Sequence, residues 1–129
     1  SADLKESGLR EILNYGHTLA HAIEKCENFS WRHGEAVSVG CVFAAHLGVV
    51  RGLLTDADVE RHVNAFSRVG LPVTYSGTSF DELLDVMLSD KKVRAGQLRF
   101  VLLDGIGNAA TYRILPDEAR QVATRLGIA

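Results

Sequence analysis

The sequence AVSVGCVFAAHLGVV, residues 36–50, decides the fold because it is the longest apolar stretch of the chain. Only Ser38 and His46 interrupt its apolar character. A helix that spans a membrane needs about 18 or more apolar residues, so the stretch predicts a buried core helix and no membrane partner. Four small residues suit close packing of this helix against its neighbours: Gly40, Ala44, Ala45 and Gly48.

Helical patterns continue on both sides of this core helix. Thr55 is a favourable N-cap, and Pro116 is typical of the first position of a helix. Two strand-like runs near the C-terminus flank a glycine-containing turn, which predicts a hairpin. The expected elements are helices over residues 3–27, 33–52, 55–69, 80–88 and 116–126, and strands over residues 98–103 and 110–115. We therefore expect a mainly α fold with a small β-hairpin and no nucleotide-binding sheet.

Length and composition favour one ordinary folded domain. The chain has 129 residues, 47% of them hydrophobic and 23% charged, as in globular proteins of average composition. The formal net charge of −2 gives no basic excess to bind a nucleic-acid backbone, so a nucleic-acid partner is not expected. Two cysteines without a CxxC pair favour a reducing compartment. The chain begins at Ser1 without a targeting segment, and we expect a cytoplasmic piece of a longer protein.

The first predicted helix presents an unusual polar stripe. At about 100° per residue, Arg10, Asn14, His17, His21 and Glu24 fall on one narrow face, opposite an apolar face. A solvated face usually carries lysine and glutamate, whereas this one offers hydrogen-bond donors and imidazoles that can bind an anion or a metal ion.

A glycine, Gly16, lies inside this predicted helix. Glycine costs about 1 kcal/mol there relative to alanine. A close approach of another chain segment or of a ligand would explain it.

Three histidines are grouped so that they can share one site. His17 and His21 are four residues apart on one helix face, and His33 opens the core helix. Two antiparallel helices joined by a short connector would bring His33 beside His17. A catalytic zinc ion usually has three protein ligands and one open position. The third ligand could be His21, Glu35, Cys26, Cys41 or a residue outside this chain.

The same residues also allow a purely structural interpretation. A histidine pair at this spacing often belongs to a surface or a core, and we expect a hydrogen-bonded core position for His46 and a surface position for His62. Trp31 is expected to pack in the connector. The sequence Asp90-Lys91-Lys92 is either a solvated turn or a cationic clamp for a carboxylate or phosphate.

Several ordered motifs resemble one enzyme family. The sequence LNYGHTLAHAIE, residues 13–24, is similar to the family signature LNxGHTxGHAxE, with Ala20 where the family more often has glycine. HGEAV at 33–37, DKK at 90–92, GQLRFVLL at 96–103 and IG at 106–107 resemble its later motifs in the same order. The family is 3-dehydroquinate synthase, and the resemblance covers nearly the whole chain.

This resemblance implies an activity and cofactors that spacing alone cannot indicate. Members of the family are lyases of the shikimate pathway of aromatic amino acid biosynthesis. They convert 3-deoxy-D-arabino-heptulosonate 7-phosphate to 3-dehydroquinate and phosphate, with recycled NAD and a divalent metal, usually Zn2+ or alternatively Co2+. The resemblance implies that His17 and His33 bind the metal and that His21 contacts substrate and can transfer a proton. It further implies anionic-substrate contacts by Arg10, Asn14 and either Lys91 or Lys92.

The resemblance also implies how the chain is organised. Residues 1–129 are expected to form the helical C-terminal metal- and substrate-binding domain of the dehydroquinate synthase-like fold. An N-terminal NAD-binding α/β domain would carry the third metal ligand, a glutamate, and a substrate-binding lysine. The isolated chain is therefore expected to be inactive and to bind metal weakly. The intact enzyme is expected to be a homodimer.

Three other functions are compatible with these patterns. Related sugar-phosphate cyclases share the fold and metal site, and metal-dependent glycerol-type dehydrogenases share a broader architecture. A free-standing helical metal-binding or interaction module would have the same histidines without the enzymatic partner domain.

Overall fold

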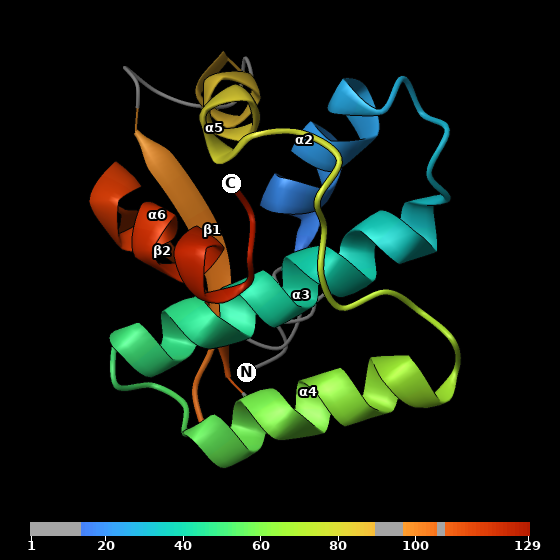
Figure 1. The fold of residues 1–129 in the computed structure, drawn as a ribbon. Coiled ribbons are helices and arrows are strands. Elements are labelled where there is room, and N and C mark those ends of the chain that lie inside the picture. Colours follow the sequence, from blue (N-terminus) through green and yellow to red (C-terminus); the bar gives the residue numbers. More distant parts are fainter. Residues whose placement is uncertain (1–13, 90–96, 106–107) are drawn as a thin grey trace, which may run out of the picture.

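The computed structural model describes residues 14–89, 97–105 and 108–129. Five helices and one two-stranded antiparallel sheet lie in these ranges (Figure 1). The elements are α2 (His17–Cys26), α3 (His33–Val50), α4 (Asp56–Arg68), α5 (Phe80–Ser89), β1 (Leu98–Leu103), β2 (Ala109–Ile114) and α6 (Pro116–Arg125). The expected mainly α fold with a small hairpin is confirmed.

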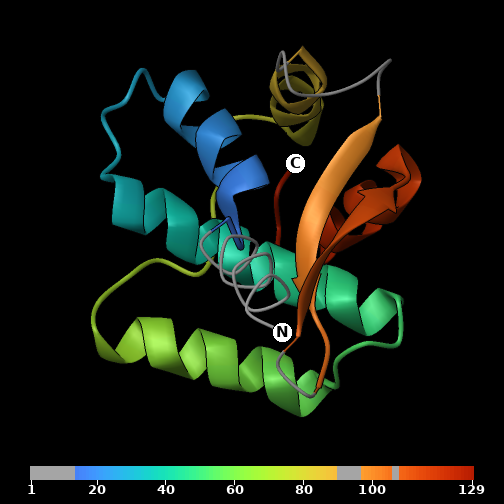
Figure 2. The ribbon, with the colours of Figure 1, turned by 180° about the vertical axis from the view of Figure 1, so that it is seen from behind.

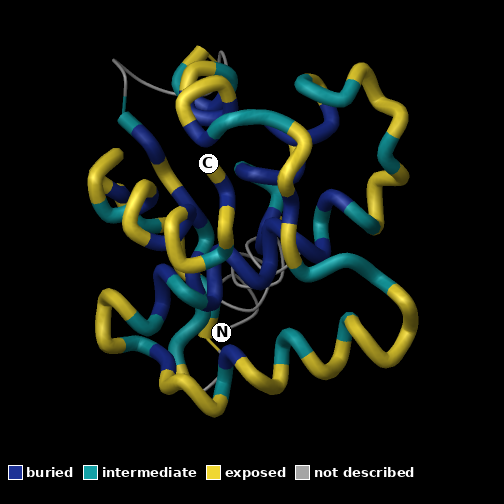
Figure 3. Tube along the Cα trace, viewed as in Figure 1, coloured by how far each residue is buried: buried dark blue, intermediate teal, exposed yellow. Residues whose placement is uncertain are grey.

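Helix α3 runs through the middle of the molecule and is packed on several sides. Helix α4 lies along one side of it, and α2 and the hairpin lie on the others (Figures 1 and 2). Its length and composition would allow it to cross a membrane, but most of it is buried within this fold (Figure 3). Apolar residues all round a helix require such enclosure, so α3 is the core helix that the sequence predicts.

Aromatic residues join the core helix to the hairpin and to α5. Phe43 of α3 stacks on Phe100 of β1, with ring centroids 5.6 Å apart, and on Phe80 of α5 at 6.3 Å. The strands pair from Leu98 opposite Ile114 to Leu103 opposite Ala109. Successive side chains of a strand point to opposite faces, so alternate β1 residues enter the core and the intervening ones lie outside it.

The helix ends follow from local hydrogen bonds. The Thr55 hydroxyl accepts from the backbone N–H of Asp58, and the Asp58 carboxylate accepts from the backbone N–H of Thr55. Glu35 Oε1 accepts in the same way from the N–H of Arg32 at the start of α3, at 2.9 Å. These bonds satisfy amide groups that a helix N-terminus leaves without intrahelical partners.

The predicted continuous helix over residues 3–27 is wrong at residues 14–16, which form a turn before α2. Residues 3–13 lie outside the described residues. Gly16 has a φ of 79°, a left-handed conformation that ends regular helix. A Cβ built on Gly16 would lie 2.6 Å from the backbone N of Cys41, and one on Gly40 would lie 1.9 Å from the Gly16 oxygen. The close approach predicted at Gly16 is therefore the crossing of α3.

Candidate metal and substrate site

Two of the predicted ligands, His17 and His33, lie side by side. Each is the first residue of its helix, α2 and α3 respectively. Their ring centroids are 5.3 Å apart, and the His21 ring lies 5.8 Å from that of His17. The close packing of α2 on α3 at Gly16 and Gly40 sets this separation. The juxtaposition of His17 and His33 expected from the sequence is confirmed.

Both rings are held through their Nδ1 atoms. His17 Nδ1 is 3.2 Å from the carbonyl oxygen of Tyr15, and His33 Nδ1 is 3.2 Å from Glu24 Oε1. A carbonyl oxygen only accepts, so Nδ1 of His17 donates, and in the neutral imidazole its Nε2 then keeps a free lone pair. Histidines that bind metals characteristically donate their other N–H to a carbonyl or carboxylate. The pair therefore fits two imidazole ligands of a divalent metal ion.

Two other candidates for a third ligand, Glu35 and Cys41, make hydrogen bonds of their own. Glu35 caps α3. The buried Cys41 thiol donates to the carbonyl oxygen of Tyr15, and burial raises the pKa of Cys41 to about 12. Burial also raises the pKa of the half-buried Cys26 thiol. Within residues 14–89, 97–105 and 108–129, no group of three His, Cys, Asp or Glu side chains can hold a metal ion.

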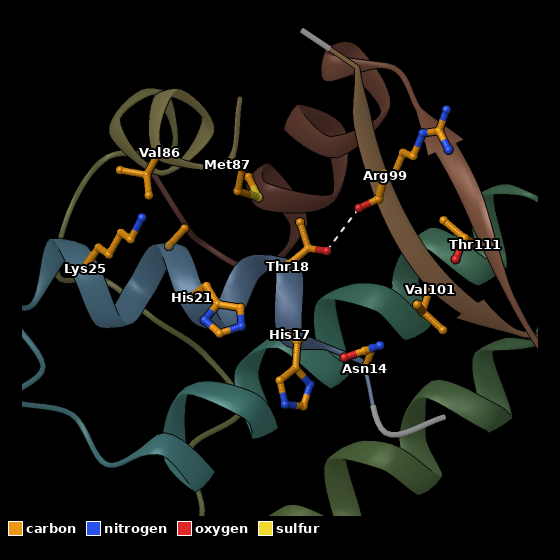
Figure 4. Close-up of a pocket in the computed structure, with 11 residues that line it drawn as sticks. Asn14, His17, Thr18, His21, Lys25, Val86, Met87, Arg99, Val101 and Thr111 are labelled. Atoms are coloured by element: carbon orange, nitrogen blue, oxygen red, sulfur yellow. Dashed lines mark hydrogen bonds between the residues drawn. The ribbon is translucent and has the colours of Figure 1, made fainter. Parts of the chain in front are cut away.

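A groove of about 400 Å³ opens beside the histidines. It lies between α2, α5 and the hairpin (Figure 4). The predicted residues Asn14, His17 and His21 line it, so Asn14 reaches the site from the turn rather than from a helix. The remaining lining residues are Thr18, Ala22, Lys25, Val86, Met87, Arg99, Val101 and Thr111.

Sequence reasoning missed two cations that line this groove, Lys25 and Arg99. Lys25 follows His21 by four residues and so shares its helix face. Arg99 lies between the buried residues Leu98 and Phe100, and strand alternation could have indicated that it faces away from the core. The Thr18 hydroxyl donates to the carbonyl oxygen of Arg99 at 3.0 Å and connects α2 to β1 across the groove (Figure 4).

Other predicted residues have different outcomes. Arg10, Lys91 and Lys92 lie outside the described residues. His62 was expected on the surface, but it is half-buried, with Nε2 3.0 Å from the Tyr15 hydroxyl. The expectation was wrong because α4 packs against α3 and brings His62 to the buried Tyr15.

Two further expectations concern His46 and Trp31. His46 was expected at a hydrogen-bonded core position, but it is half-buried on α3 rather than fully enclosed, and burial lowers its pKa. Trp31 packs edge-on against Tyr75, with ring centroids 5.3 Å apart, so the packing expected for the connector is confirmed.

Most of the chain matches the sequence profile of a known protein family. Residues 1–93 match the sequence profile of the family described as 3-dehydroquinate synthase C-terminal. The chain belongs to this family. The resemblance read from the histidine motifs is thereby confirmed.

Curated relatives of this chain are closely similar to it in sequence. The 3-dehydroquinate synthase of Mycolicibacterium vanbaalenii is 63% identical over 107 residues, which are 83% of this chain and 30% of the relative. The 3-dehydroquinate synthase of Rhodococcus erythropolis is 54% identical over all 129 residues, and the match covers 35% of that relative. The chain therefore spans about a third of the length of the curated relatives that it matches.

Solved structures of two synthases share the fold of this chain. A 2-deoxy-scyllo-inosose synthase complexed with carbaglucose-6-phosphate, NAD+ and Co2+ has a TM-score of 0.80 and 27% identity, with 95% of this chain and 36% of that chain covered. A 2-epi-5-epi-valiolone synthase from Streptomyces hygroscopicus, with NAD+ and Zn2+ bound, has a TM-score of 0.77 and 26% identity. Its match covers 88% of this chain and 32% of that chain.

Proposed function

We propose that this chain supplies the metal- and substrate-binding half of a 3-dehydroquinate synthase. The reaction would convert 3-deoxy-D-arabino-heptulosonate 7-phosphate to 3-dehydroquinate and phosphate. The observation that carries the proposal is the His17–His33 pair beside a groove lined by Lys25 and Arg99. Relatives at 54% to 63% identity bear that enzyme name, which supports this substrate over that of more distant synthases.

His17 and His33 would hold a divalent ion, Zn2+ or Co2+, through their Nε2 atoms. When bound, such an ion lowers the pKa of a coordinated hydroxyl and polarises a developing carbonyl. Related synthases contain NAD+ together with Zn2+ or Co2+, and NAD would accept and return the hydride. The third ligand and the NAD site would come from an N-terminal domain of a longer, cytoplasmic and homodimeric enzyme.

The groove residues would bind the anionic substrate. Lys25 and Arg99 supply positive charge, and Asn14 supplies an amide donor, the combination that recognises phosphate and carboxylate groups. His21 is exposed at the groove and would exchange a proton with the substrate. Arg10 and one of Lys91 and Lys92 would add further charge.

The test is product formation by the intact enzyme that we propose, supplied with NAD, Zn2+ and 3-deoxy-D-arabino-heptulosonate 7-phosphate. We expect dehydroquinate, and we expect His17→Ala and His33→Ala to lower kcat by more than about 100-fold, because even outer-shell partners of ligands are worth 10–100-fold. His46→Gln, which changes another α3 histidine away from the groove, is the control. Absence of dehydroquinate with the unaltered enzyme would contradict the proposal.

A related sugar-phosphate cyclase is the second candidate, because the structural neighbours at 26% and 27% identity are named 2-epi-5-epi-valiolone synthase and 2-deoxy-scyllo-inosose synthase, the latter bound to carbaglucose-6-phosphate. Product analysis separates the two. Conversion of a sugar phosphate other than 3-deoxy-D-arabino-heptulosonate 7-phosphate, with no dehydroquinate formed, would favour this alternative.

A further inference from the structure

Glu24 is a buried acidic side chain in a helix that otherwise buries apolar residues. It is 9% exposed, and Glu24 and Ser38 are the two buried polar residues among the described parts of the chain. Charged residues are almost never fully buried without a partner. A polar partner is therefore expected next to the Glu24 carboxylate.

The contacts of this carboxylate lie beneath the histidine site. Glu24 Oε1 is 3.2 Å from Nδ1 of His33 and 3.9 Å from Nδ1 of His21. The two histidine side chains are 58% and 59% exposed, whereas the Glu24 side chain is 12% exposed. Two largely exposed rings thus lie beside one buried acceptor, and the shorter contact, to His33, crosses from α2 to α3.

His17 offers a comparison within the same site. Its Nδ1 is held by a backbone carbonyl oxygen, that of Tyr15, so no side chain is needed to orient the ring. His33 begins α3 after a connector in which Asn28 and Phe29 have φ values of 52° and 59°. Its ring is oriented by the Glu24 side chain instead. A substitution of Glu24 can therefore change the tautomer of His33, whereas no side-chain substitution removes the backbone acceptor of His17.

We infer that Glu24 is a positioning residue for His33. By accepting from Nδ1–H, it selects the tautomer in which Nε2 is unprotonated. The consequence for metal binding rests on the proposed function, because it takes His33 as a ligand. The consequence for the tautomer does not.

The first experiment measures the tautomer without metal. Nitrogen chemical shifts of the imidazole rings, recorded by NMR on the 129-residue chain at a pH where the rings are neutral, report which nitrogen carries the proton. We expect Nδ1–H at both His17 and His33 in the unaltered chain. In Glu24→Ala, His33 should shift toward Nε2–H while His17 stays as it was, which provides an internal control.

The second experiment measures affinity for Co2+, followed by the absorption of the bound ion in the intact enzyme. We expect Glu24→Ala to weaken binding by about 10- to 100-fold, the range for outer-shell partners. Glu24→Gln, which has nearly the same shape and retains an acceptor oxygen, should restore part of the affinity and keep the fold if alanine does not. Glu60→Gln removes an exposed carboxylate of α4 and should change neither measurement.

The two proposals can fail separately. An unchanged His33 tautomer in folded Glu24→Ala would overturn the positioning role, whatever the enzyme converts. Co2+ affinity that is unchanged in both Glu24→Ala and Glu24→Gln would also overturn it. A changed tautomer with weakened Co2+ binding supports it even if the intact enzyme forms no dehydroquinate, in which case only the proposed reaction is wrong.

Discussion

Gly16 meets two constraints at one residue. Its φ of 79° is costly for residues with a Cβ, and that Cβ would lie 2.6 Å from the Cys41 backbone nitrogen. The conformation alone costs about 1–2 kcal/mol, and forced overpacking costs typically 1–3 kcal/mol more. We expect Gly16→Ala to lower the free energy of unfolding by roughly 3 kcal/mol, measured by urea denaturation.

Gly52 supplies the matched control for this prediction. Its φ is 74°, but a Cβ there would meet nothing within 4 Å. Gly52→Ala should therefore lose only the conformational part, about 1–2 kcal/mol. Equal losses for the two variants would show that the crossing of α2 and α3 is not tight at Gly16.

Single residues also show where sequence reasoning succeeds and stops. Helical periodicity placed His17, His21 and Glu24 on one face, and motif resemblance identified the histidine pair. Periodicity could not predict that α2 begins only after Gly16, because the crossing with α3 is a contact between segments distant in sequence. Nor could it assign Glu24 a role, since burial and the contact to His33 depend on that same crossing.

At the scale of elements, the predicted helices and strands from residue 33 onward agree closely with the structure, whereas the helix predicted over residues 3–27 is observed only from His17 to Cys26 within the described residues. The core helix, the capped α4 and the proline-led α6 all carry local signals that fix where they begin, and α5 and the hairpin also fall where they were expected. The groove between α2, α5 and the hairpin has no local signal. Lys25 and Arg99 were missed because only tertiary packing brings them to one surface.

An ion pair connects the end of α3 to α6 and should make stability depend on pH. Arg51 donates to both carboxylate oxygens of Glu118, at 2.7 and 2.8 Å, and to the carbonyl oxygen of Arg113. The hydrogen bond from Arg51 holds the pKa of Glu118 below its ordinary value. Stability from this pair is therefore present above the unfolded pKa of about 4.3 and is lost as pH falls through the lower folded pKa.

Glu118→Gln tests this connection. We expect the free energy of unfolding to fall by about 0.5–1 kcal/mol at pH 7, within the range for partly exposed pairs. The difference from the unaltered chain should shrink below the folded pKa of Glu118, where the protonated Glu118 carboxyl is as neutral as the glutamine amide that replaces it. Denaturant unfolding at pH 7 and near pH 2 measures it, and a difference that is the same at both pH values would contradict the assignment.

At the scale of the whole molecule, the described residues contain no group of three His, Cys, Asp or Glu side chains that could hold a metal ion, and the proposed function takes two ligands from them, His17 and His33. We expect the isolated 129-residue chain to bind Zn2+ at least about 100-fold more weakly than the intact enzyme, because changes outside the ligand set alone cost 10–100-fold. Competition with a chromophoric chelator measures both. His17→Ala and His33→Ala should abolish the residual binding.

Tight Zn2+ binding by the isolated chain would contradict this prediction. It would favour a free-standing metal-binding module, because two imidazoles are not expected to suffice. A measured lack of turnover by the isolated chain, together with weak binding, would agree with a site shared between two domains.

The contacts on the two sides of the site join residues at very different separations in the sequence. Glu24 and His33 are 9 residues apart, whereas Thr18 and Arg99 are 81 apart. Short loops close at a smaller entropic cost than long ones, and local contacts speed folding. During folding, the imidazole pair is therefore expected to assemble early, as a helical hairpin, and the groove is completed only when the distant β-ribbon docks.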